Sequence, residues 1–437
     1  MSEILFRYQR VEPTTWAYLS SLLVIALYFK FSRCWSVRNL DLVVLILLAP
    51  GLLLVKYGMD RGEPAVSVEH IGYIWLFAVN GCLLLRLLLD AAMVRRPLLE
   101  PNLSVGGLAF LGVSLYLFLM ANVVTGTPEA ADVAGSQRAA QLQNLEATQA
   151  ELNTLKTHGP GFPLIYLLPH ISTQSLLGRE AHDGERVADT PARSVRRVNV
   201  VTAQLVAILS QLAIVLGMTL VGLRHFDNIR AGIAAATLYL LLPYTAMWTG
   251  SVTHALPGAL VVWAVLFYRR PLLSGAMMGL AFGTIYYPVF LLPLWISFYW
   301  QRGLVRFLLG FAATVVVLVV TLAFTSADLA MFWACLRQMF GIQFPIAENL
   351  RGAWQFWNEV YRYPLLAAFV ALSVSFVIWP AQKNLATLIS CSAALMLATQ
   401  FWHAHSGGLA LAWYLPLLLL TAFRPNLEDR VATSVVK

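Results

Sequence analysis

The feature that most constrains this chain is a series of long apolar runs, interrupted once by a polar stretch at 125–197. Hydrophobic residues make up 59% of the sequence and charged residues 12%. No water-soluble fold could bury that much apolar surface, so lipid must cover part of it. Only helices and closed barrels satisfy their backbone hydrogen bonds in lipid. The apolar runs are continuous rather than alternating, which predicts an all-α polytopic transmembrane bundle.

A spanning helix needs about 20 mostly apolar residues. The runs predict about 11 to 13 spans, since the short runs flanking Pro257, Pro271 and Pro288 can be broken or merged. The candidate spans are 15–31, 40–55, 71–90, 104–124, 198–222, 230–247, 253–267, 271–284, 286–300, 304–324, 362–380, 384–400 and 406–423. We expect an N-terminal transmembrane block at 1–103, a core at 104–324, an outer aromatic segment at 325–361 and a C-terminal block at 362–437.

The net charge of +8 follows from the topology. Arginines gather in the short segments between apolar runs, for example at Arg95, Arg96, Arg269 and Arg270. Short basic loops face the cytoplasm, which places the polar stretch at 125–197 and the aromatic segment on the outer face. The charge therefore gives no indication of nucleic-acid binding. The side on which the N-terminus lies stays open, because thirteen spans would place it outside.

The outer segments carry amphipathic helices in this interpretation. Residues 137–157 are rich in Ala, Leu, Gln and Glu and have leucines on one stripe, which predicts an amphipathic helix. Residues 178–197 are charged and contain Gly and Pro, which favours a flexible loop. The aromatic segment contains Trp354 among other rings, and it is interpreted either as an interfacial aromatic belt or as a groove for a lipid-linked sugar.

Two acidic residues, Glu129 and Asp132, follow directly on the span that ends near residue 124. A carboxylate at the membrane surface could act as a general base that takes a proton from an acceptor hydroxyl. It could also hold a divalent cation, Mg²⁺ or Mn²⁺, against a phosphate leaving group. The structural alternative is that both residues stabilise the N-terminus of the following helix.

Histidines form a second set of candidates on the outer face. His403 and His405 lie in a short loop between the last two spans, where imidazole can donate to a phosphate. A His-x-His pair also fits a metal, but no third ligand is identifiable. Arg351 is a candidate phosphate fork, because a guanidinium matches two phosphate oxygens at once. The set is His158, His170, His254, His403 and His405.

Several short patterns occur in order from His158 onward. They are His158-Gly-Pro-Gly-Phe-Pro-Leu-Ile-Tyr166, Arg196-Arg197-Val-Asn-Val200, the small-residue run from Ile229 to Pro243 followed by Trp248-Thr-Gly250, Arg269-Arg270-Pro271 through Gly275 and Gly279 to Tyr287-Pro288, and Trp413-Tyr414-Leu-Pro416. Their order resembles that of the integral-membrane GT-C glycosyltransferases of the mannosyltransferase and arabinosyltransferase type. Tyr287 stands where the family pattern has lysine.

The resemblance implies a GT-C-like bundle whose first large outer loop carries the catalytic acid, and Glu129 and Asp132 match that acid by position. It implies transfer of a sugar from a polyprenyl-phosphate donor to a lipid or glycan acceptor at the outer face of a bacterial inner membrane. Arg351, His403 and His405 would hold the phosphate, and His158, Trp354 and Tyr414 would contact substrate. Two alternatives stay open, namely a multi-span transporter or lipid flippase, and a non-catalytic GT-C-like subunit.

Overall fold

The computed structural model describes residues 11–93, 99–143, 159, 161–183, 191–325, 350, 352–404 and 407–427, with a few single positions elsewhere. The fold is all-α, and the described residues form no β-strand. Five helices are long and apolar enough to cross a membrane, which indicates a membrane protein. These five are Val37–Arg61, Glu63–Leu88, Val105–Val124, Val195–Arg224 and Leu304–Phe324.

The described helices follow one another along the chain, together with several 3-10 turns. They are α2 (Pro13–Tyr28), α3 (Val37–Ile46), α4 (Leu48–Arg61), α5 (Val66–Leu88), α6 (Val105–Val124), α7 (Ala130–Gln143), α9 (Gly161–Asp183), α10 (Pro191–Arg224), α11 (Ile229–Leu241), α12 (Pro243–Met247), α13 (Val252–Leu266), α14 (Pro271–Thr284), α15 (Leu292–Tyr299), α16 (Leu304–Thr325), α18 (Arg362–Ser375), α19 (Leu385–Ala398) and α20 (Leu415–Phe423). The 3-10 turns used below are η2 (Glu63–Ala65), η4 (Tyr287–Leu291), η5 (Ala353–Gln355) and η8 (Leu411–Trp413).

Prolines and glycines explain why several apolar runs give short helices. Pro243 and Pro271 each occupy the first position of a helix, where the missing N–H costs nothing, so each ends the run before it. The expected span 406–423 is helical only from Leu415. Gly408, before it, adopts a positive φ of 89°, a left-handed conformation that a helix cannot include.

Central and peripheral helices differ in what surrounds them. Every residue of α19 is buried, and α11, α13 and α20 are buried along most of their length. The peripheral helices α6 and α16 expose large apolar side chains instead, such as Phe110 and Phe324 at 76% and 79% exposure. Lipid is the solvent that accommodates such side chains, so the outer surface of these helices indicates contact with the bilayer.

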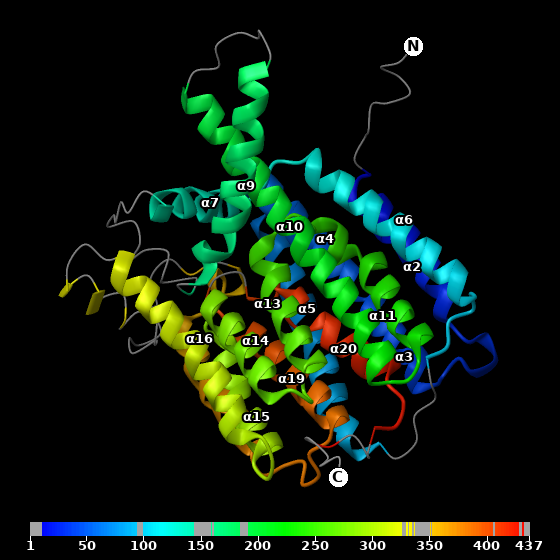
Figure 1. The fold of residues 1–437 in the computed structure, drawn as a ribbon. Helices are drawn as coiled ribbons and strands as arrows, with labels where there is room; N and C mark the ends of the chain where they lie inside the picture. The colour runs from blue at the N-terminus through cyan, green and yellow to red at the C-terminus, as the bar shows by residue number, and fades with distance from the viewer. Residues whose placement is uncertain are drawn as a thin grey trace.

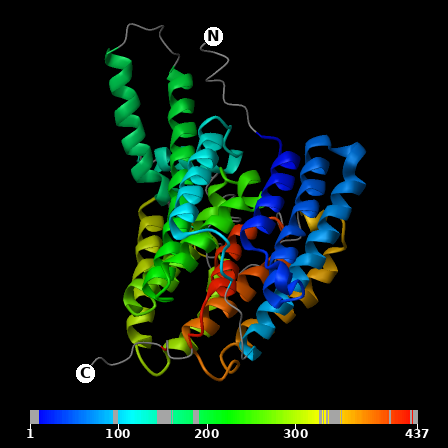
Figure 2. The same cartoon turned by 90° about the vertical axis from the view of Figure 1, so that its right-hand side faces the viewer.

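The two ends of the bundle differ in shape. Figures 1 and 2 show α9 and the start of α10 extending beyond the bundle at one end, with the turn between α15 and α16 at the other. Arg302 lies in that turn. The structure thus separates a basic turn from the polar stretch, as the charge pattern predicts.

The polar stretch is more helical than its composition suggests. The interpretation of 178–197 as a flexible loop is wrong for 178–183 and 191–197, which belong to α9 and α10. Pro191 begins α10 at a position where proline is favoured, so it starts a helix here rather than a loop. Of the amphipathic helix expected at 137–157, residues 137–143 lie in α7, and 144–157 lie outside the described residues.

Close packing of α14 against α16 depends on glycine. A Cβ added to Gly310 would lie 2.0 Å from the backbone oxygen of Leu272, and one on Gly275 would lie 2.0 Å from that of Phe307. Small residues at these positions let two helix backbones approach, as is common for helices packed within membranes.

Replacing Gly310 with alanine is therefore expected to destabilise the protein by about 1–3 kcal/mol, because a backbone must move to admit the methyl group. Gly106 is the matched control, since it lies in α6 with nothing within 4 Å of an added Cβ. Both substitutions raise helix propensity equally. Thermal unfolding in detergent should show a lower Tm for Gly310→Ala only; equal Tm values would contradict this packing account.

Candidate active site

Glu129 lies between α6 and α7, immediately before the first residue of α7. Its backbone oxygen accepts hydrogen bonds from the N–H groups of Asp132 and Val133 at 3.1 Å. Its exposed side chain accepts a hydrogen bond from Ser251 Oγ at 3.0 Å. Ser251 immediately precedes α13, so the carboxylate of Glu129 joins two segments that are far apart in the sequence.

Asp132 lies in the first turn of α7 and is fully buried. Tyr166 of α9 donates its hydroxyl to Oδ1 at 3.0 Å, and the backbone N–H of Val252 donates to Oδ2 at 3.2 Å. Val252 is the first residue of α13, whose N-terminus favours a negative charge. Both carboxylates thus meet the start of α13, but only Glu129 is accessible.

The buried position changes the acidity of Asp132. α7 is not among the candidate membrane spans. Burial, followed by the nearby charge of Glu129, raises the pKa of Asp132 to about 7, although the N–H of Val252 and the hydroxyl of Tyr166 oppose the shift. Two carboxylates with such different surroundings are suited to different roles.

Aromatic side chains from α12 and α13 lie beside this pair. The hydroxyl of Tyr244 is 2.8 Å from Nδ1 of His254, and the Trp248 ring stacks on Tyr244 with centroids 5.3 Å apart. His254 is one of the outer histidines predicted from the sequence, and Trp248 belongs to the Trp248-Thr-Gly pattern. Tyr166, Ser251 and Tyr244 were not predicted to be partners of the site.

A second cluster also contacts the first turn of α13. Trp413 donates its Nε1 hydrogen to the backbone oxygen of Thr253 at 3.1 Å. The Trp413 ring centroid lies 5.3 Å from that of Tyr287 and 5.4 Å from that of His403. We call the group of Tyr287, Trp354, Arg362, Trp402, His403 and Trp413 the arginine–aromatic cluster.

Arg362 provides the positive charge of the arginine–aromatic cluster. It is buried, its Nε donates to the backbone oxygen of Trp402 at 3.2 Å, and its guanidinium lies 5.9 Å from the Trp354 ring centroid. Its two terminal nitrogens donate to no described residue. The indole N–H groups of Trp354 and Trp402 are also buried without an acceptor in the described structure. The cluster is therefore rich in donors that an anion could satisfy.

The predicted site residues fall into three groups. Glu129 and Asp132 come together at α13, while Trp354 and His403 belong to the arginine–aromatic cluster. His158, Arg351 and His405 lie outside the described residues. Arg362 was not predicted; its only signal in the sequence is its place at the boundary between the aromatic segment and α18.

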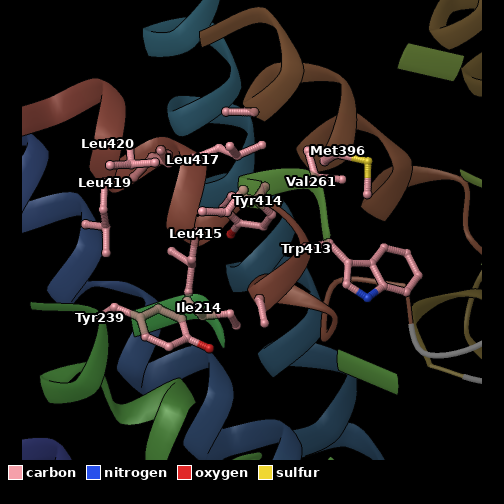
Figure 3. Close-up of a cluster of buried hydrophobic side chains, with 14 of the residues drawn as sticks. Ile214, Tyr239, Val261, Met396, Trp413, Tyr414, Leu415, Leu417, Leu419 and Leu420 are labelled. Carbon is pink, nitrogen blue, oxygen red and sulfur yellow. The ribbon is translucent and has the colours of Figure 1, made fainter. Parts of the chain in front are cut away.

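Tyr414 does not line either part of the site. It is fully buried, and its hydroxyl donates to Asn80 Oδ1 at 2.5 Å. Figure 3 shows it among side chains of α10, α11, α13, α19 and α20, with Trp413 pointing in a different direction. Since the phenol is enclosed and already hydrogen-bonded, the structure gives Tyr414 a packing position.

Within the described part of the chain, no group of three His, Cys, Asp or Glu side chains lies close enough to hold a metal ion. Comparison of the sequence with models of known protein families and with curated proteins, and of the structure with solved structures, finds no match.

Proposed function

We propose that this protein is a GT-C-like membrane glycosyltransferase that moves a sugar from a polyprenyl-phosphate donor to a hydroxyl acceptor at the outer membrane face. The observation that carries the proposal is the first turn of α13, which contacts both the carboxylate pair and the arginine–aromatic cluster. Val252 and Thr253 are adjacent residues, and they bind Asp132 and Trp413 respectively.

In the proposed reaction, the acceptor hydroxyl attacks the anomeric carbon of the donor sugar. The new C–O bond forms as the bond from the anomeric carbon to the phosphate oxygen breaks, and polyprenyl phosphate leaves with the electron pair. Glu129 takes the hydroxyl proton as general base. It is the accessible member of the pair, so it is the residue that would touch substrate.

Asp132 acts as a positioning residue in this scheme. It holds the start of α7 against α13 through Val252 and against α9 through Tyr166.

The arginine–aromatic cluster would bind the leaving phosphate. Arg362 presents two terminal nitrogens, and a guanidinium fork matches two phosphate oxygens. The unsatisfied N–H groups of Trp354 and Trp402 would add donors to the same anion. Aromatic faces in the cluster also suit a sugar ring, as the sequence analysis proposed for Trp354.

The proposal is tested with purified protein reconstituted in liposomes and supplied with mannose- and arabinose-labelled polyprenyl phosphates. The expected products are free polyprenyl phosphate and a glycoside of inverted anomeric configuration. A single displacement inverts the configuration at the anomeric carbon. No transfer, combined with flux of the intact lipid across the bilayer, would contradict the proposal in favour of a flippase.

The acidity of Asp132 gives a separate prediction for stability. The folded protein holds this proton up to a pKa of about 7, whereas the ordinary value is 3.8. The contribution of Asp132 to the free energy of unfolding is therefore largest below about pH 4. This contribution falls as the pH rises from about 4 to about 7. Wild-type Tm should fall between pH 5 and pH 8, and Asp132→Asn should show a smaller fall. The same pH dependence in both proteins would contradict the assignment.

A further inference from the structure

A cavity of about 440 Å³ lies beside Glu129, and none of its lining residues belongs to the arginine–aromatic cluster. One wall comes from the chain around Glu129 and Ser251 and from α6, α10 and α12. The opposite wall comes from α2 and α4, which belong to the N-terminal block at 1–103. The cavity therefore joins the accessible carboxylate to helices outside the segments that resemble the GT-C pattern.

Several of the polar groups that line this cavity are hydrogen-bond acceptors. Glu12 and Glu129 contribute exposed carboxylates. Gln204 uses its Nε2 to bind three backbone oxygens at the end of α6, at 3.0 to 3.1 Å, while its Oε1 makes no hydrogen bond in the described structure. Acceptors of this kind match hydroxyl donors on a ligand.

The charge balance argues against an anionic ligand in the cavity. Lys56 is the one basic side chain among its lining residues, and Asp60 already pairs with it at 2.9 Å. Glu12 and Glu129 leave the cavity negative overall. A phosphate would thus meet repulsion here, in contrast to the donor-rich surroundings of Arg362.

Aromatic rings form the apolar part of the wall. Trp16 and Phe118 stack with centroids 5.4 Å apart and an interplanar angle of 15°. Trp16 is 6% exposed, and its Nε1 is buried without an acceptor in the described residues. Flat rings beside hydroxyl-matching acceptors are suited to the apolar face and the hydroxyl edge of a sugar.

We infer that this cavity binds the acceptor as a neutral, hydroxyl-rich saccharide, and that Glu12 and Trp16 of α2 and its N-terminal flank determine acceptor specificity. The inference rests on the proposed function for its use, since Glu129 would then accept the proton of a hydroxyl held in the cavity. Binding of the saccharide itself can be measured without any transfer.

The experiment uses the purified full chain in nanodiscs, with octyl mannoside as a neutral probe below its micelle concentration and octyl phosphate as an anionic probe. Glu12→Gln and Trp16→Phe should each weaken octyl mannoside binding at least about fivefold. Glu12→Gln replaces a charged acceptor oxygen with an NH2 donor, and Trp16→Phe reduces the flat aromatic surface beside the sugar. Octyl phosphate binding should be unchanged by both and should fall in Arg362→Ala. Glu63→Gln, an exposed carboxylate in η2 that does not line the cavity, is the matched control.

Failure of this inference is distinguishable from failure of the proposed function. Octyl mannoside binding that is absent, or unaffected by both variants, would overturn the cavity assignment even if transfer is active. Octyl phosphate that loses affinity in Glu12→Gln would overturn it too. Saccharide binding that depends on Glu12 and Trp16, in a protein without transfer activity, would support the cavity and contradict the transferase.

Discussion

Glu129→Gln is expected to lower kcat for sugar transfer by at least about 100-fold, because general-base catalysis contributes about 10²–10⁴ in rate. The amide keeps the size of the side chain and can still accept the hydrogen bond from Ser251, but it cannot take a proton. Binding of the donor should change little, since the donor phosphate lies with Arg362 in this account. The measurement is initial transfer rate against donor concentration.

Two further variants make the result specific to the base. Glu129→Asp keeps a carboxylate but withdraws it by one methylene, so it should retain part of the activity. Glu63→Gln removes an exposed carboxylate elsewhere and should match the wild type. Full activity in Glu129→Gln would exclude this side chain as the base, and full loss in Glu63→Gln would show that the assay reports general damage.

Arg362→Ala is expected to raise KM for the donor by about 10-fold to 100-fold, since a hydrogen bond to a charged group is worth about 1.5–3 kcal/mol. The donor KM of Arg362→Lys should lie between those of Arg362→Ala and the wild type, because lysine keeps the charge without the planar fork. The acceptor KM should stay close to the wild-type value in both variants.

The control for Arg362 is Arg302→Ala, which removes an exposed arginine from the turn between α15 and α16. It should leave both KM values unchanged. A loss of kcat without any change in donor KM in Arg362→Lys would contradict a phosphate-binding role. Tm measured in parallel separates this loss from unfolding, because Arg362→Ala also leaves the Trp402 oxygen without its donor.

Hydropathy predicts much of the helical layout because lipid imposes it on each segment separately. The apolar run at 104–124 becomes α6, and that at 304–324 becomes most of α16. Helix boundaries differ from the predicted runs where the local backbone conformation ends or interrupts a helix. The expected span at 40–55 lies within the candidate span Val37–Arg61, in which the one residue Leu47 separates α3 from α4. The run before Leu415 is interrupted at Gly408.

The candidate site could be predicted only in part, since its contacts join distant segments. The position of Glu129 and Asp132 after an apolar run was sufficient to single them out. Nothing in the sequence indicates that Val252, 120 residues away, donates to Asp132, because this contact depends on how α7 packs against α13. The same limit explains why Arg362 was not chosen.

Adjacent residues can also have unrelated surroundings. Trp413 and Tyr414 belong to one short pattern, yet Trp413 reaches the start of α13 while Tyr414 is enclosed beside Asn80. Successive side chains around the η8 turn point in different directions, so a family pattern that covers both residues cannot assign them the same role. Only the packing of α5, α13 and α20 separates them.

The most direct test of the account is transfer of labelled sugar from a defined polyprenyl-phosphate donor by reconstituted wild type and Glu129→Gln, with lipid flux recorded in the same liposomes. The account predicts labelled glycoside from the wild type, at least about 100-fold less from the variant, and no flux that depends on Glu129. Equal transfer by the two proteins, or flux without transfer, would contradict it.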